Sequence, residues 1–153
     1  MSAHKTELTL GPVLFNWAPE VWRDFYFRIA DEAPVETVIV GEVVCSKRTP
    51  FFAEHIPAVI ERLQGAGKQV LLASPILATT EREREAVKEL VESAGDFLVE
   101  ANDMGCVAQL GGKPHWIGPY VNVYNEATLG WMAKRGAKTV SLAGELTESA
   151  ITA

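Results

Sequence analysis

The stretch Thr37–Val44, TVIVGEVV, decides the fold class of this chain. It is rich in β-branched residues, and apolar side chains stand on both faces of the strand that it predicts. Strands buried on both faces are typical of parallel sheets that helices cover on either side. The stretch therefore indicates a parallel strand in the interior of the molecule.

Strand and helix patterns alternate on both sides of this stretch. Strands are expected at Leu8–Phe15, Thr37–Val44, Gln69–Ala73, Asp96–Glu100, His115–Ile117 and Thr139–Leu142. Helical patterns begin at Pro19 and cover Pro57–Gln64, Thr80–Ser93, Met104–Leu110 and Asn125–Arg135. This alternation predicts parallel strands with right-handed helical crossovers. We expect an α/β fold in one domain, residues 1–153, built as parallel strand-helix repeats of a (β/α) TIM-type barrel, incomplete at about six strands.

An open, doubly wound sheet is the alternative to a barrel. A complete barrel of eight units takes about 250 residues. In this chain Thr147 is expected to cap a further helix, after which too few residues follow to cover the last strand. The first and sixth strands would then be sheet edges, which pair readily with a partner or with a second copy.

Composition excludes several classes of function. Fourteen Lys and Arg against twenty Asp and Glu give a net charge of −6, which disfavours nucleic acid as a partner. No apolar run approaches the roughly 18 residues of a membrane span, and the start MSAHKTELT does not have the pattern of a secretory signal. We therefore expect a cytoplasmic protein whose two cysteines stay reduced.

Polar residues at the carboxyl ends of the expected strands are the candidates for chemistry, because parallel sheets bind ligands there. These candidates are Asn16, Trp17, Glu42, Cys45, Lys47, Arg48, Glu100, Asn102, Asp103, Tyr120, Asn122, Asn125 and Glu145. Carboxylates held close together have raised pKa values that suit proton transfer. Glu42, Glu100 and Glu145, with Asn122, are therefore the predicted catalytic set. Solvated carboxylates, or partners of the nearby cations, are the equally weighted alternative.

The two cysteines differ in their surroundings. Cys45 precedes Lys47 and Arg48, and neighbouring cations favour a thiolate that can act as nucleophile or metal ligand. A small buried hydrophobic residue is the alternative interpretation. Cys106, within MGCVAQL, is expected to pack in the core. Two cysteines cannot complete a four-thiolate metal site.

Four segments carry a resemblance to a known family. They are GPVLFNW (11–17), GEVVCSKR (41–48), FLVEANDMG (97–105) and YVNVYNEATL (120–129). Their order and spacing resemble the collagenase-like peptidase family, over nearly the whole chain. The closest resemblance is to the branch that hydroxylates ring precursors of ubiquinone without oxygen, as an accessory protein beside a related partner.

The resemblance also implies a cofactor and its ligands. Proteins of this branch carry a 4Fe-4S cluster held by four cysteines, and Cys45 matches the first of them. The other three ligands would lie outside these 153 residues, and Cys106 matches none. The family also implies a (β/α) barrel.

Two other functions follow from the family as alternatives. One is peptidase activity with Glu42 and Glu100 as acid and base, although these residues assemble no known constellation for peptide hydrolysis. The other is hydroxylation of RNA bases, against which the acidic charge argues. A purely structural chain that pairs through its strand edges is a third possibility.

Overall fold

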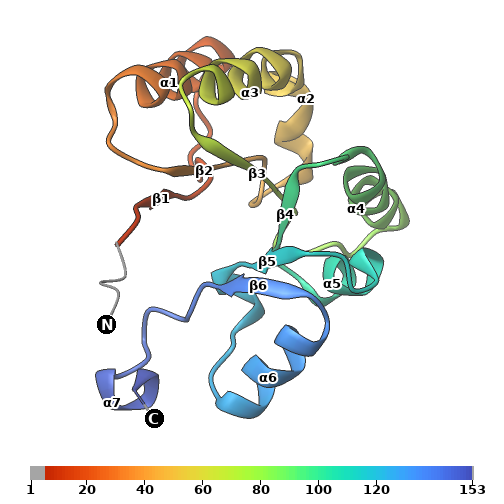
Figure 1. Cartoon of the computed structure of the whole chain (residues 1–153). Helices are drawn as coiled ribbons and strands as arrows, with labels where there is room; N and C mark the ends of the chain where they lie inside the picture. Colours follow the sequence, from red (N-terminus) through yellow and green to blue (C-terminus); the bar gives the residue numbers. More distant parts are fainter. Residues whose placement is uncertain (1–5, 153) are drawn as a thin grey trace. The chain divides into compact units, whose positions relative to one another are not determined.

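The computed structural model describes residues 6–152, and its strands alternate with helical segments (Figure 1). The strands are β1 (Thr9–Leu10), β2 (Thr37–Val40), β3 (Gln69–Ala73), β4 (Leu98–Ala101), β5 (His115–Ile117) and β6 (Ala137–Val140). The α-helices are α1 (Pro19–Glu32), α2 (Thr49–Phe52), α3 (Ile56–Gly65), α4 (Glu81–Ser93), α5 (Met104–Leu110), α6 (Glu126–Lys134) and α7 (Glu148–Ile151). Short 3-10 turns lie at Ser46–Arg48, Ala53–His55 and Pro119–Val121.

The strands are hydrogen-bonded in chain order, β1-β2-β3-β4-β5-β6, in a six-stranded sheet. Pairing is parallel between β1 and β2, between β4 and β5, and between β5 and β6. Each strand leads into a helical segment before the next strand begins. The predicted α/β class, with six parallel strands alternating with helices, is therefore confirmed.

The chain divides into two compact units, the first ending at Leu71 and the second beginning at Leu72. This boundary falls within β3. The expectation of one domain over residues 1–153 stays a prediction.

Helix α1 organises the core of the first unit. Pro19 fits its first turn, where a backbone N–H would have no partner in the helix. Trp22, Tyr26 and Ala30 form its buried face at spacings of four residues. The Tyr26 hydroxyl accepts a hydrogen bond from the N–H of Val13 at 3.3 Å and donates one to the carbonyl of Ile39 at 3.4 Å. One phenol therefore connects the segments that follow β1 with strand β2.

Strand β2 is fully buried, as the predicted pattern of its sequence requires. It ends at Val40 rather than Val44, because Gly41 adopts φ 151° and the chain turns away from the ladder. Glu42 and Cys45 therefore lie on the loop after the strand.

The second unit has a continuous apolar core between strands and helices. Its buried members include Val87, Val91, Val99, Cys106, Val107, Leu110, Ile117, Val123 and Met132. Helix α4 begins with a capping box: Thr80 Oγ1 accepts from the N–H of Glu83, and the Glu83 side chain accepts from the N–H of Thr80. Two donors that the helix leaves unpaired are thereby satisfied, which fixes where α4 starts.

Several predicted boundaries are wrong. Strand β1 has two residues where Leu8–Phe15 was expected, because the chain leaves the ladder after Leu10. Strand β6 begins at Ala137, two residues before the predicted Thr139. On helix α6 Trp131 is exposed, and the centroid of its ring lies 4.0 Å from the guanidinium carbon of Arg135. Among the described residues, no helix combines the length and apolar character needed to cross a membrane.

Candidate functional site

In the first unit the strand-end residues form a loop organised by Glu42. Its side chain is 8% exposed, and its Oε1 accepts the backbone N–H groups of Val44 at 2.7 Å and Cys45 at 2.8 Å. The two bonds hold Cys45 at the start of the 3-10 turn Ser46–Arg48. The Glu42 carboxylate is therefore used to fix the loop that carries the cysteine.

Cys45 is partly exposed and lies beside basic residues of the same loop. Lys47 is exposed, whereas the Arg48 side chain donates through Nη1 to the carbonyl oxygen of Leu14 at 3.1 Å. Arg48 thus ties the loop after β2 to the loop after β1. On the same loop after β1, Trp17 packs against the rings of Phe15 and Phe25, with centroids 6.1 and 5.3 Å away.

The second unit contains a buried polar cluster at the carboxyl end of β4. It consists of Ser74, Glu100 and Asn102, of which Glu100 is 3% exposed and the other two are fully enclosed. Asn102 Nδ2 donates to the carbonyl of Ser74 at 3.0 Å and to Glu100 Oε2 at 3.1 Å, while its backbone N–H donates to Ser74 Oγ at 2.9 Å. Both acceptors of Nδ2 are oxygens, so the orientation of the amide is determined by its partners.

Burial dominates the electrostatics of this cluster. Removal of the Glu100 carboxyl from water raises its pKa, and the hydrogen bond from Asn102 lowers it by a smaller amount. Among the described residues, no ion pair involves Glu100. A buried carboxyl without a cationic partner has the character of a proton donor and acceptor.

Two atoms of the cluster keep unused hydrogen-bonding capacity. Asn102 Oδ1 is fully buried and accepts from no described residue. Glu100 Oε1 also has no such partner, but it is not enclosed, so the small exposure of Glu100 leaves this oxygen reachable from solvent. In this cluster Glu100 Oε1 therefore faces solvent, whereas Asn102 Oδ1 faces the interior.

The remaining predicted residues of this unit have other roles. Asp103 and Asn125 are N-caps, accepting the backbone N–H groups of Cys106 at 2.7 Å and Thr128 at 2.9 Å. Glu145 is exposed and accepts a hydrogen bond from the Tyr124 hydroxyl, which lowers the pKa of Glu145. Asn122 is exposed and left-handed, with φ 60°. Tyr120 is also exposed.

Among the described residues, the members of the predicted catalytic set hydrogen-bond to different partners and not to one another. Glu100 and Glu145 belong to one unit but hydrogen-bond to different partners, whereas Glu42 belongs to the other unit. Asn122 stands on the loop after β5, where its left-handed backbone ends the 3-10 turn Pro119–Val121. The convergence of these four residues stays a prediction.

Sequence reasoning missed Ser74, a member of the buried cluster, and Gly118, which lies against it. Ser74 directly follows a predicted strand, so the rule that selected the other candidates also applies to it. Gly118 lies against the cluster: a Cβ there would be 1.9 Å from Asn102 Oδ1 and 3.2 Å from the carboxyl carbon of Glu100. No sequence pattern points to this contact, because it depends on the approach of β5 to β4.

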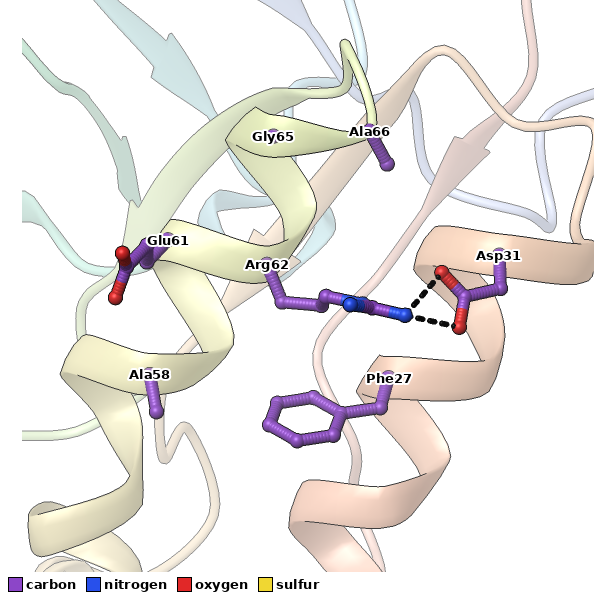
Figure 2. Close-up of a pocket in the computed structure, with 7 residues that line it drawn as sticks. All are labelled: Phe27, Asp31, Ala58, Glu61, Arg62, Gly65 and Ala66. Atoms are coloured by element: carbon purple, nitrogen blue, oxygen red, sulfur yellow. Dashed lines mark hydrogen bonds and ion pairs between the residues drawn. The ribbon is translucent and has the colours of Figure 1, made fainter.

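A hollow of about 610 Å³ lies between α1 and α3 of the first unit, and none of the predicted strand-end residues lines it (Figure 2). Its lining is Phe27, Asp31, Ala58, Glu61, Arg62, Gly65 and Ala66. Arg62 Nη2 donates to both carboxylate oxygens of Asp31, at 2.9 and 2.7 Å. The charges of Arg62 and Asp31 therefore satisfy each other within the hollow.

The residues present do not assemble a metal centre by themselves. No group of three or more His, Cys, Asp or Glu side chains is positioned to hold a metal ion within residues 6–152. Cys106, the second of two cysteines, is fully buried, and burial raises the pKa of its thiol to about 11. An iron-sulfur cluster needs four thiolates, and this chain offers one that is accessible.

Comparison with known proteins adds no family to this description. No protein-family model matches the chain, and no solved structure matches it.

Proposed function

We propose that this chain acts as a UbiV-like accessory protein in the oxygen-independent hydroxylation steps of ubiquinone synthesis. The observation that carries the proposal is where the four family-like segments lie. GPVLFNW follows β1, GEVVCSKR follows β2, FLVEANDMG contains β4 and its carboxyl end, and YVNVYNEATL follows β5. All four contribute to the strand ends at which parallel α/β proteins bind their ligands.

The surroundings of Cys45 support its assignment as a ligand position. A metal ligand must be reachable and held in place, and Cys45 is partly exposed while Glu42 fixes its backbone N–H. Cys106 is also held through its backbone N–H, but an incoming metal cannot reach it, since it is enclosed in the core of the second unit. In this proposal Cys45 supplies one thiolate of a 4Fe-4S cluster, and three thiolates come from outside these 153 residues.

The proposal includes three finer assignments. The parallel strand-helix repeats belong to a TIM-type barrel, of which about six strands lie in this sequence. The partner is a UbiU-like protein or a second copy of the chain. The working compartment is the cytoplasm, where both thiols stay reduced.

The test is anaerobic purification of a longer form of the protein that contains the expected downstream cysteines, co-expressed with a UbiU-like protein. We expect the two proteins to co-purify and to show the visible absorption, iron and sulfide of a cluster after reconstitution. Cys45→Ser should abolish the cluster, whereas Cys106→Ser, the matched control, should retain it. Residues 1–153 alone should bind no stable cluster.

The outcome that contradicts the metal assignment is a longer form without a cluster, or one in which Cys45→Ser still holds it. The pathway assignment has a separate readout. In an anaerobically grown bacterial strain that lacks UbiV, the longer form should restore ubiquinone. Cleavage of denatured collagen that is lost in Glu42→Gln would instead support peptidase activity.

A further inference from the structure

We propose that Glu100, positioned by Asn102 and Ser74, forms a proton-exchanging site in the second unit. This site binds an uncharged, apolar ligand, which Glu100 contacts through its oxygen Oε1. The proposal goes beyond the accessory role and does not depend on a cluster. It rests on the arrangement of the polar cluster and on the side chains that follow the strands of this unit.

The two carboxyl oxygens of Glu100 are in different situations. Oε2 receives the Nδ2–H of Asn102 at 3.1 Å, which is held in turn by the Ser74 carbonyl at 3.0 Å. Oε1 bonds to no described residue and is not enclosed. A carboxyl fixed through one oxygen and free at the other can present its proton to a ligand in a constant direction.

The buried amide adds an independent observation. Asn102 is fully enclosed, and its Oδ1 has no partner among the described residues. An unpaired buried acceptor is destabilising. Because Nδ2 of the same amide makes two hydrogen bonds, we infer that the amide is held for its donor side. That donor can stabilise the carboxylate that remains after Glu100 gives up its proton.

The loops around this end of the unit favour an uncharged ligand. Residues 74–80, 102–104, 118–125 and 141–147 contain no lysine or arginine, so these loops provide no cation to hold a phosphate or carboxylate. Arg84 of α4 reaches Thr79, but it donates to the carbonyl there at 2.8 Å. The exposed large apolar side chains that follow β3, β4, β5 and β6 are Leu77, Met104, Tyr120, Tyr124 and Leu142.

Few other groups affect the proton of Glu100. Burial raises its pKa, and the Asn102 donor opposes this. Two titratable groups adjoin the cluster: Asp103, which follows Asn102 and caps α5, and the Cys106 thiol, which bonds to Ser74. Neither contributes to the raised pKa of Glu100. Proton exchange is then simple: the Oε1 proton moves to an oxygen of the ligand, and the carboxylate formed is held by Asn102 Nδ2–H until the proton returns.

Labelling with dicyclohexylcarbodiimide, an uncharged and apolar reagent, tests the site directly. The O–H of a carboxylic acid adds across one C=N bond of the reagent, and the O-acylisourea rearranges to a stable N-acylurea without a leaving group. In a pH series we expect peptide mass spectrometry to show that the label on Glu100 persists to higher pH than the label on exposed carboxylates. Labelling should fall as the pH rises. Glu100→Gln should remove this label, and Glu89→Gln, a change on the exposed face of α4, should leave it.

Asn102→Ala separates a positioning role from a structural one. Loss of the Nδ2 donor leaves the carboxylate less stabilised, so the pH midpoint of Glu100 labelling should move upward while circular dichroism remains native. An unchanged or lower midpoint in a folded variant would overturn the positioning role. If the variant does not fold, the labelling of the wild-type chain decides: no label on Glu100 at any pH, or loss of its label at the same pH as that of exposed carboxylates, would overturn the proposal. These readouts are independent of ubiquinone synthesis.

Discussion

Gly118 lies directly against the side-chain oxygen of Asn102, so closely that a Cβ at Gly118 would be 1.9 Å from Oδ1. The backbone N–H of Gly118 donates to the carbonyl of Ala101 at 2.8 Å, which fixes the approach of the segment after β5 to the end of β4. The amide cannot withdraw, because Nδ2 is bonded to both Ser74 and Glu100. Glycine at this position is therefore a requirement of the polar cluster.

We predict that Gly118→Ala lowers the free energy of unfolding by about 1–3 kcal/mol, the usual cost of forcing an extra carbon into a packed site. Urea denaturation measures the change. Gly130→Ala is the matched control: nothing lies within 4 Å of a Cβ there, and the position is inside α6. It should raise stability by about 0.5–1 kcal/mol, as alanine does within a helix. Equal effects of the two substitutions would contradict the packing described here.

Glu42 should stabilise the Cys45 loop through its carboxylate oxygen rather than through its charge. We predict that Glu42→Ala costs about 1 kcal/mol in urea denaturation, because the N–H groups of Val44 and Cys45 lose their acceptor. Water can replace part of this interaction, since Val44 is exposed. Glu42→Gln keeps an acceptor oxygen and should change stability much less. A cost for glutamine as large as that for alanine would show that the charge matters instead.

The two thiols should differ strongly in reactivity. At pH 8 a disulfide reagent should modify Cys45 of the native chain rapidly and Cys106 only on unfolding. Cys106 is fully buried with a pKa of about 11, and thiolate is the reactive form. Cys45→Ser should remove the rapid phase, and Cys106→Ser should leave it intact. Two equally rapid phases in the wild-type chain would contradict the burial of Cys106.

Stability should depend on pH through Glu100. Its pKa is raised above the ordinary 4.5, so the folded state keeps this proton to higher pH than the unfolded state does. Between the two pKa values the folded state binds more protons, and its stability therefore decreases as the pH rises through that window. Glu100→Gln, a neutral isostere, should match the wild type below pH 4.5 and be more stable above the raised pKa. Chemical denaturation across pH checks this, and an equal effect of Glu89→Gln would refute it.

The outer strands should promote association. Strands β1 and β6 each have one neighbour in the sheet order, and both central residues of β6, Lys138 and Thr139, are exposed. Unpaired edge N–H and C=O groups pair readily with another strand. Light scattering of residues 1–153 at micromolar concentration should therefore detect a dimer or larger species. A monodisperse monomer with a cooperative melting transition would show that the edges are otherwise protected.

Local sequence signals predicted most of the secondary structure. The strand Gln69–Ala73 and the helix Met104–Leu110 have the predicted bounds. Thr80, Asn125 and Thr147, at which helices were predicted to start, are the N-caps of α4, α6 and α7. Capping depends on residues only a few positions apart, so a sequence reveals it. The ends of the strands were less predictable, because the residue at which a strand stops pairing depends on the neighbouring strand in the sheet.

The polar cluster of the second unit could be predicted only in part. Glu100 and Asn102 follow from the rule that strand ends carry chemistry. The contact between Asn102 and Gly118, and the choice of Tyr26 rather than Phe25 as the fully buried ring of α1, depend on packing between distant segments. Helical periodicity cannot distinguish adjacent aromatic residues near the edge of a buried face.

The boundary between the two units has a consequence for genetic dissection of the protein. It falls between Leu71 and Leu72, in the middle of the five-residue strand β3. A gene split at that position would give one product the first three residues of the strand and the other product the last two. Expression of either half as an independent protein therefore requires a break placed in a connecting segment, with the whole of Gln69–Ala73 retained on one side.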